Sequence, residues 1–566
     1  MRVTSILLSV AAAVGAQSHQ SPSPYGEHGA KHRSWDDNDE YSYRHWGIRI
    51  AASSSAQAAV TYSNATFSQL IDHSDPSLGT FEQFYYYDTT SWNGPGSPVV
   101  LFTPGEVNAT RYYTYLTTNK TTGVLASEIG AAVIVLEHRY WGTSTPVANF
   151  KTENMKYLTL DNAIKDMTHF ANTVQLPFAP NGSNAKDVPW VTMGGSYSGA
   201  LSAWIASLDP GTLWAYHSSS APVEAISDYW SYFLPVQQGM PKNCSKDVSL
   251  VIDYMDDVLT DGSREQQQKL KAMFNMEGLA HNDDFMAALE NGPWLWQGNQ
   301  FYTNTGFFEW CDYIENAVDA GNVTYGNSTI PGEEGVGLEK ALAGYAKWNV
   351  EVFLPGYCEN LGPYPDFAGT DNIACFDTYN ASSPLYTDTS LANPISRQWV
   401  WMTCNEPFGY NQDGAPKDRP TIVSRLVDAQ YWIRQCGLFF PDGPNGETYG
   451  IAKGKTEEQV NEWTGGWDIV NTTRLIYVNG EFDPWREASV SSDIRPGGRL
   501  ESTEQVPLEM VPGGFHVSDL TTQNGVVNAG VKAVQDRVVA QLAAWVNEWP
   551  KKGGYNHGKR GESWRA

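Results

Sequence analysis

The first indication of the fold is the stretch Val191-Thr-Met-Gly-Gly-Ser-Tyr-Ser-Gly-Ala200. It lies between an apolar run that ends at Met193 and a helix-like stretch that continues through Leu208. Small residues surround Ser196, as a very tight strand-to-helix turn requires. Such a turn lifts one hydroxyl onto the rim of a sheet, above a helix N-terminus. Ser196 is therefore the candidate nucleophile, and a glycine-rich turn without catalytic function is the alternative.

The elbow departs from the usual pattern at one position. Gly-x-Ser-x-Gly would place glycine at 198, but this chain has Ser198 and then Gly199. Serine is small enough for the same turn. In α/β-hydrolases the acid and then the histidine follow the nucleophile, at the ends of later strands. That order gives a test of the assignment.

The base is identified by elimination among the histidines that follow the elbow, which are His217, His281, His516 and His557. His557 lies in a terminal run rich in Gly, Lys and Arg that we expect to be disordered. His217 falls on the next expected strand and is read as packing, and His281 lies in a polar middle region. His516 follows the apolar run 506–511 in a Gly-Gly-Phe-His loop. This position is the one expected for the base.

The acid should precede His516 at the end of another strand. The apolar run Leu475–Asn479 is followed by Gly480-Glu-Phe-Asp-Pro-Trp485, which is typical of a turn. Asp483 is therefore the predicted acid, and Glu481 is the alternative carboxylate.

The oxyanion formed on attack requires two N–H donors. The Tyr197 amide, at the start of the elbow helix, is one. The second is expected in the loop 103–107, from the amides of Gly105 and Glu106. A Pro-Gly turn with no role is the alternative for this loop.

The chain has 566 residues, with 41% hydrophobic and 13% aromatic, which is enough for a large packed core. About 290 residues separate the elbow from the acid, and from about 225 to 430 Trp, Tyr, Asn and Gly become dense. We expect an α/β-hydrolase fold with a largely helical cap inserted between the nucleophile and the acid and histidine. The expected divisions are a hydrolase part at 59–224, the cap at 225–430, a second hydrolase part at 431–549 and a disordered tail at 550–566.

Seven strands are expected in a mostly parallel sheet: 81–87, 98–103, 131–137, 189–193, 215–221, 475–479 and 506–511. In the cap, 249–259 and 264–276 look helical. Three- and four-residue spacing of apolar residues from Val531 to Trp549 predicts a final helix.

The N-terminus predicts export. Residues 1–16 have a basic start and a short apolar segment, typical of a cleaved signal peptide, and 17–58 is interpreted as a mobile lead segment. We expect a secreted glycoprotein, with a vacuolar or lysosome-like compartment as the alternative. The candidate glycosylation sites are Asn64, Asn108, Asn119, Asn181, Asn243, Asn322, Asn327, Asn380 and Asn471.

The cysteines and the net charge limit the possible partners and the cellular environment of this protein. The six cysteines lie in the middle of the chain and away from the elbow, which predicts up to three disulfides, with 15 pairings open, and no zinc site. A formal net charge of −26 disfavours nucleic acid and anionic membranes as partners and favours an acidic medium. No cofactor or metal is expected, and the sequence leaves the oligomeric state open.

With these residues assigned, the chain resembles the prolyl-specific serine peptidases, which include lysosomal Pro-X carboxypeptidase, dipeptidyl-peptidase II and secreted fungal acid prolyl endoproteases. The resemblance covers most of the mature chain. The segments that carry it are Glu137-His-Arg-Tyr-Trp-Gly-Thr-Ser144, Tyr157-Leu-Thr-Leu160, Gly194–Ala200, Ser219-Ser-Ala-Pro222, Thr403-Cys-Asn-Glu406, Asn479–Trp485 and Gly514-Phe-His516.

The resemblance implies the same triad, Ser196, Asp483 and His516, beneath a helical insertion. It implies that Trp485 lines a proline pocket, with a core tryptophan as the alternative. Glu406 is a candidate contact for a substrate amine, with a buried structural acid as the alternative. The family pattern also implies the disulfides Cys404–Cys436, Cys244–Cys311 and Cys358–Cys375.

The leading functional prediction is a secreted serine peptidase that cleaves peptides after proline at acid pH. An esterase or lipase with the same triad is the second hypothesis, because the triad serves esters equally well. An inactive secreted binding protein is the third. The sequence leaves open whether cleavage is internal or at a chain end, as a carboxypeptidase would act.

Overall fold

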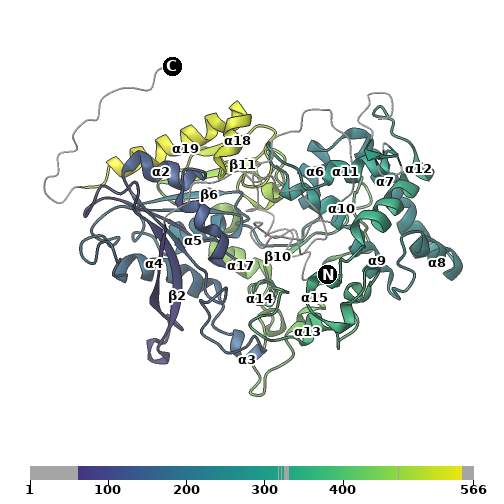
Figure 1. Cartoon of the computed structure of the whole chain (residues 1–566), viewed down its shortest axis with the longest axis horizontal. Coiled ribbons are helices and arrows are strands. Elements are labelled where there is room, and N and C mark those ends of the chain that lie inside the picture. Colours follow the sequence, from purple (N-terminus) through teal and green to yellow (C-terminus); the bar gives the residue numbers. More distant parts are fainter. Residues whose placement is uncertain (1–61, 317, 320–321, 324–330, 470, 551–566) are drawn as a thin grey trace, which may run out of the picture.

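The computed structural model describes residues 62–550, except 317, 320–321, 324–330 and 470 (Figure 1). The expected signal peptide, the lead segment and residues 551–566 of the expected tail lie outside the described residues. The centre of the molecule is an eight-stranded sheet with the order β1-β2-β4-β3-β5-β6-β11-β12. β1 and β2, and β2 and β4, pair antiparallel, and every other neighbouring pair is parallel.

The seven expected strands are all present, and an eighth, β1, precedes them. Their bounds are β1 Ser63–Leu70, β2 Thr80–Asp88, β3 Val99–Phe102, β4 Ala132–Leu136, β5 Trp190–Gly195, β6 Ala215–Ser219, β11 Leu475–Gly480 and β12 Leu508–Val511. The central strands β3 and β4 are buried along their whole length. Strands covered on both faces read as continuous apolar runs, which made them recognisable in the sequence.

Helices cover both faces of the sheet (Figure 1). On one face, α2 (Thr121–Ile129) and α19 (Ala529–Asn547) pack on apolar side chains of β3, β4 and β5. On the other face, α4 (Leu160–Thr173) and α5 (Tyr197–Leu208) share a larger core with the inserted helices. In α19 the predicted apolar face is buried from Val531 to Trp545, while Trp549 lies beyond the helix and packs edge-on against Trp214.

A helical region lies between β6 and β11 and occupies the right-hand part of Figure 1. Three disulfides brace it, with the pairing that the family resemblance implied: Cys244–Cys311, Cys358–Cys375 and Cys404–Cys436. Its helices are α6 Phe233–Gly239, α7 Lys242–Asp261, α8 Arg264–Met273, α9 Asn282–Leu289, α10 Asn291–Trp294, α11 Phe307–Ile314, α12 Leu338–Trp348, α13 Pro384–Thr387, α14 Arg397–Asn405, α15 Ala429–Ile433, α16 Cys436–Phe439 and α17 Glu457–Thr464. The limits 225 and 430 for the cap stay a prediction, and helices continue beyond them to α17.

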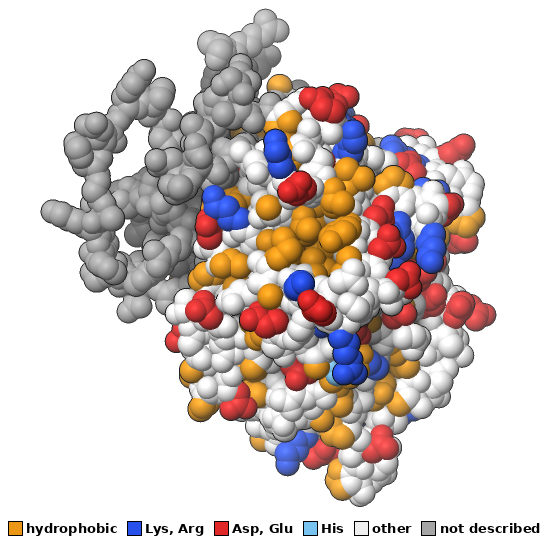
Figure 2. Space-filling view, turned by 90° about the vertical axis from the view of Figure 1, so that its right-hand side faces the viewer, with side chains coloured by type: hydrophobic (Ala, Val, Ile, Leu, Met, Phe, Trp, Pro, Cys, Tyr) orange, Lys and Arg blue, Asp and Glu red, His pale blue; other side chains and the backbone are white. Residues whose placement is uncertain are grey.

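The remaining elements are short. They include α3 (Thr152–Met155), α18 (Thr522–Val527), the parallel pair β7 (Ile226–Asp228) and β10 (Gly409–Asn411), and the pair β8 (Val318–Asp319) and β9 (Asn322–Val323). Figure 2 shows the outer face of the helical region, where hydrophobic side chains gather among acidic and basic ones. In the described part of the chain, no helix has both the length and the apolar character needed to cross a bilayer.

The mostly parallel sheet, helices on both faces and a helical insertion after β6 form an α/β-hydrolase fold with a cap. In such sheets the carboxyl ends of the parallel strands meet at one edge. The elbow follows β5, the predicted acid follows β11 and the predicted base follows β12, so this topology brings the three together.

Candidate active site

Ser196 occupies the turn between β5 and α5 with φ 59° and ψ −133°. A non-glycine residue with positive φ is uncommon and is held in place by its surroundings. The turn is so tight that a Cβ on Gly194 would lie 2.0 Å from the Ser198 carbonyl oxygen, and one on Gly199 would lie 2.6 Å from the Ser219 carbonyl oxygen. The small residues that suggested an elbow are therefore required by the close approach of the backbone.

Ser198, the departure from the usual pattern, has a structural role in the elbow. Its hydroxyl donates to the Gly195 carbonyl at 2.8 Å and accepts from the Gly195 amide at 3.0 Å. The side chain thus closes the turn at a position where glycine could form neither bond.

His516 and Asp483 form the predicted base and acid pair. Nδ1 of His516 lies 2.8 Å from Oδ1 of Asp483, and both residues are fully buried. Burial acts to raise the pKa of the Asp483 carboxyl, but attraction to His516 and hydrogen bonds, including one from Ser220, hold that pKa below its ordinary value. An ionised acid fixes the imidazole with Nδ1 protonated and leaves Nε2 to accept a proton.

The predicted mechanism transfers a proton from the Ser196 hydroxyl to the His516 imidazole. Across the described ranges, neither Oγ of Ser196 nor Nε2 of His516 has a hydrogen-bond partner. The end of β6 connects their loops, because the Ser196 amide donates to the Ser219 carbonyl at 2.9 Å and the Val517 amide donates to the Ser220 hydroxyl at 2.8 Å. The serine-to-histidine bond itself is not formed, and such bonds often tighten only around a substrate.

The predicted oxyanion loop lies against the elbow. A Cβ on Gly105, which has φ 75°, would lie 3.3 Å from the Tyr197 ring and 3.6 Å from the Ser198 amide nitrogen. The Gly105 amide makes only a long bond, 3.3 Å, to the Thr103 hydroxyl. Glu106 is buried, and burial raises the pKa of its carboxyl well above the ordinary value, so this acid is neutral at low pH. The role of Gly105, Glu106 and Tyr197 as donors stays a prediction.

His138 is a site neighbour that the sequence did not single out. Its Nδ1 lies 2.8 Å from the Arg139 carbonyl oxygen, so Nε2 accepts from the Tyr197 hydroxyl at 3.1 Å. Burial lowers the pKa of His138 to about 4. The neutral imidazole therefore holds the side chain of Tyr197, the first residue of the elbow helix α5.

Trp485 follows the acid and is only 1% exposed. Its indole N–H donates to Oε1 of Gln297 at 2.8 Å, and its ring centroid lies 6.4 Å from that of His516. Tyr229, Tyr232 and Tyr410 pack around it with centroid distances of 5.2 to 5.6 Å. Gln297 was missed because it lies 188 residues earlier, in the cap, and has no sequence signal of its own.

The other candidate carboxylates are already engaged elsewhere. Glu481 accepts from the Gly513 amide at 2.8 Å, so Asp483 alone faces the base. Glu406 is 4% exposed, accepts from the Leu160 amide at 3.1 Å and forms an ion pair with Lys455. These contacts favour the alternative, a buried structural acid, and the role of Glu406 as a contact for a substrate amine stays a prediction.

Six of the candidate glycosylation residues, Asn64, Asn108, Asn119, Asn181, Asn380 and Asn471, are exposed. Asn243 is buried, and its Nδ2 donates to the Pro331 carbonyl at 3.5 Å, so it is a poorer candidate than the exposed sites. The side chain of Asn322 and the whole of Asn327 lie outside the described residues.

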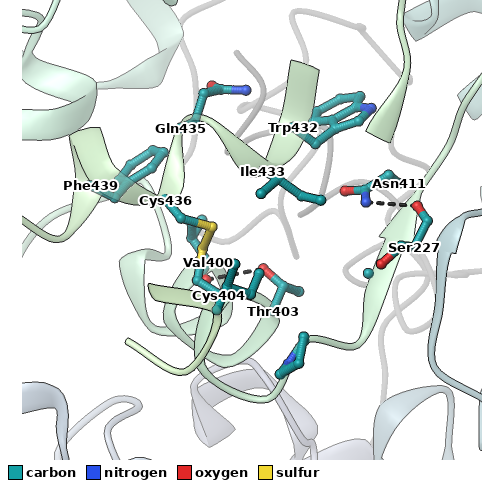
Figure 3. Close-up of a pocket in the computed structure, with 13 residues that line it drawn as sticks. Ser227, Val400, Thr403, Cys404, Asn411, Trp432, Ile433, Gln435, Cys436 and Phe439 are labelled. Atoms are coloured by element: carbon teal, nitrogen blue, oxygen red, sulfur yellow. Dashed lines mark hydrogen bonds between the residues drawn. A yellow bond between two sulfur atoms is a disulfide. The ribbon is translucent and has the colours of Figure 1, made fainter. Parts of the chain in front are cut away.

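A cavity of about 20 Å³ lies beside the Cys404–Cys436 disulfide (Figure 3). Asn411 and Trp432 line it, and Asn411 donates to the Ser227 carbonyl at 2.7 Å. None of the residues that line this cavity belongs to the predicted triad.

The fold and the arrangement of Ser196, His516 and Asp483 are those expected of a serine hydrolase. A family model described as serine carboxypeptidase S28 matches residues 69–304 and 368–537. The chain belongs to this family of serine peptidases.

Named proteins with related sequences agree with this family. The chain is 42% identical over 501 residues to Serine protease vicPa of Bipolaris victoriae, covering 88% of this chain and 91% of that protein. It is 26% identical over 496 residues to an Arthroderma benhamiae protein named "Probable extracellular serine carboxypeptidase", covering 83% and 65%. A solved proline iminopeptidase from Mycobacterium smegmatis aligns over 86% of this chain and 99% of that chain at 12% identity with a TM-score of 0.31, a likeness too distant to say anything of function.

Proposed function

We propose that this chain is a secreted peptidase that hydrolyses peptide bonds on the carboxyl side of proline, at acid pH. Ser196 attacks the carbonyl, His516 takes the hydroxyl proton and returns it to the leaving amine, and Asp483 orients the imidazole. Water then releases the acyl group. The observation that carries the proposal is the His516–Asp483 contact of 2.8 Å beside a buried, unpaired Ser196 hydroxyl in an S28 chain.

Proline preference is supported by the aromatic group around Trp485. A pyrrolidine ring is compact and largely apolar, and a flat indole face offers it contact area without requiring hydrogen bonds. The bond from Trp485 to Gln297 and the packed tyrosines fix the indole plane near the base.

Secretion is supported by the signal-like sequence of residues 1–16, the three disulfides and the six exposed glycosylation candidates. Acid operation is supported by buried carboxyls, such as Glu106, whose raised pKa values leave them uncharged at low pH. Ionisation of Glu106 would place a negative charge at the oxyanion loop and oppose the developing negative charge.

The test uses two long peptides that differ only by proline or alanine at one internal position, at about pH 4 to 5. Mass analysis is expected to find cleavage only after proline. Amidation of the peptide C-terminus separates the two modes, because a carboxypeptidase needs the free carboxylate and an endopeptidase does not. Equal turnover of both peptides would contradict proline specificity, and hydrolysis of short acyl esters without peptide cleavage would favour the esterase hypothesis.

A further inference from the structure

A second buried polar group lies below the triad, where the base loop meets β6. Nε2 of His217 lies 2.9 Å from Oδ2 of Asp519, and the Ser219 hydroxyl donates to Oδ1 of the same carboxylate. All three residues are at most 1% exposed. The proposed mechanism uses none of them.

The group contains serine, histidine and aspartate but is not a second catalytic triad. The hydroxyl bonds to the carboxylate and not to the imidazole, so His217 cannot deprotonate Ser219. Nδ1 of His217 is buried without a partner in the ranges that the structure describes. A proton there would be a buried donor without an acceptor, so the geometry favours the arrangement in which Nε2–H donates to Asp519.

Asp519 lies three residues after the base, on the same loop. Its carbonyl oxygen accepts from the Thr121 hydroxyl and from Gln535 Nε2 at 3.1 Å, so the residue is fixed at both its backbone and its side chain. Between Asp519 and the base, Val517 has φ 48°, a strained value for a β-branched residue. Such a conformation persists only where the contacts around it are strong enough to hold it.

The partner of Asp519 also holds the nucleophile. The Ser219 hydroxyl bonds to the base loop, and the Ser219 carbonyl accepts the Ser196 amide at 2.9 Å. One residue of β6 thus contacts both loops whose spacing decides whether the proton can transfer.

We propose that Asp519 is a positioning residue that sets the base against the nucleophile, through the hydrogen bonds it accepts from Ser219 and His217. The inference rests on the proposed roles of Ser196 and His516. A displacement of about 1 Å at reacting groups can cost on the order of 100-fold in rate. Loss of the anchor should therefore lower kcat and leave substrate binding intact.

The test compares Asp519→Ala and Asp519→Asn by peptide kinetics and by the rate of fluorophosphonate labelling. We expect Asp519→Ala to lower kcat about 10- to 100-fold with KM within about twofold of wild type. Asn keeps both contacts without a change of tautomer, because its amide oxygen can accept from His217 Nε2–H and its amide N–H can donate to the Ser219 hydroxyl oxygen. Asp519→Asn should therefore recover most of the rate. If Asp519→Ala fails to fold, Ser219→Ala, which removes one hydroxyl, should show the same split between kcat and KM.

The matched control is Asp247→Asn, a buried cap carboxylate that accepts from the Val336 and Gly337 amides. It should lower Tm and leave kcat and KM unchanged. Unchanged kcat in Asp519→Ala, a rise in KM alone, or Asn as poor as Ala would each overturn the positioning role. If the wild-type protein is neither labelled nor active on proline peptides, the proposed function is wrong. If the wild-type protein is labelled and the Asp519 variants have normal kinetics, only the positioning role of Asp519 is wrong.

Discussion

At the residue scale, the site depends on one hydroxyl held in an unfavourable backbone conformation. The positive φ of Ser196 persists because Gly194 and Gly199 allow close backbone contacts on either side of the turn. Within the described part of the chain, the Ser196 hydroxyl has no hydrogen-bond partner. A hydroxyl buried without a partner is costly in a purely structural role, which argues for catalysis.

Ser196→Ala is expected to abolish fluorophosphonate labelling and to lower peptide turnover by roughly a thousandfold or more, because no other nucleophile is poised there. Asp483→Asn should reduce turnover by a similar order, since it removes the charge that orients His516. Glu481→Gln is the control and should retain near wild-type activity, because Gln still offers an oxygen to the Gly513 amide. Intact labelling of Ser196→Ala would exclude this serine as the nucleophile.

Ser198→Gly converts the elbow to the common pattern and tests what the extra hydroxyl contributes. The variant loses both bonds to Gly195 and gains backbone freedom within α5. We expect a loss of about 1 to 2 kcal/mol in unfolding free energy, with labelling of Ser196 retained. Thermal unfolding and labelling rates measure the two effects separately, and an inactive but equally stable variant would show that Ser198 acts in the chemistry.

At the element scale, the sequence predicted the buried strands, which read as continuous apolar runs, and the order of the candidate triad residues along the chain. The strands β3 and β4 were recognised because they are buried on both faces. β1 was missed because it is an edge strand whose sequence Ser-Asn-Ala-Thr-Phe-Ser-Gln-Leu is mostly polar and exposed. The contacts of Gln297 and Asp519 could not be predicted, because they join segments far apart in the chain through side chains without a motif.

The cap disulfides offer a graded test of element stability. Cys244–Cys311 joins α7 to α11 across 67 residues, and Cys358–Cys375 spans 17. Loop-closure entropy predicts that replacing the first pair with serines costs roughly 4 kcal/mol and the second roughly 3 kcal/mol. Calorimetry and limited proteolysis of the cap should show the larger loss for the longer loop, and the reverse order would indicate that local packing outweighs chain entropy.

At the scale of the whole molecule, two sets of buried groups oppose each other as pH changes. Burial and, second, nearby carboxylates raise the pKa of Glu224 to about 7, and burial and then Asp247 raise that of Glu315 to about 8. Burial lowers the pKa of His138 to about 4. The acids bind protons more tightly in the folded state than in the unfolded one, and the histidine binds its proton less tightly.

The directions of these pKa shifts predict that the protein is most stable at acid pH. Glu224 and Glu315 contribute fully below their unfolded values near 4.5, and that contribution is lost as pH rises toward 7 and 8. His138 acts oppositely: as pH falls from about 6.5 to about 4, the unfolded chain gains a proton that the buried ring resists, at a cost of roughly 3 kcal/mol. Because two acids oppose one histidine, stability already falls as pH rises above about 4.5, and the free energy of unfolding should peak at about pH 4 to 4.5. Denaturant titrations across pH 3 to 8 measure the dependence of the unfolding free energy on pH. Glu315→Gln should flatten this profile on the neutral side, and His138→Gln should flatten it on the acid side. A maximum at neutral pH in the wild-type protein would contradict this balance.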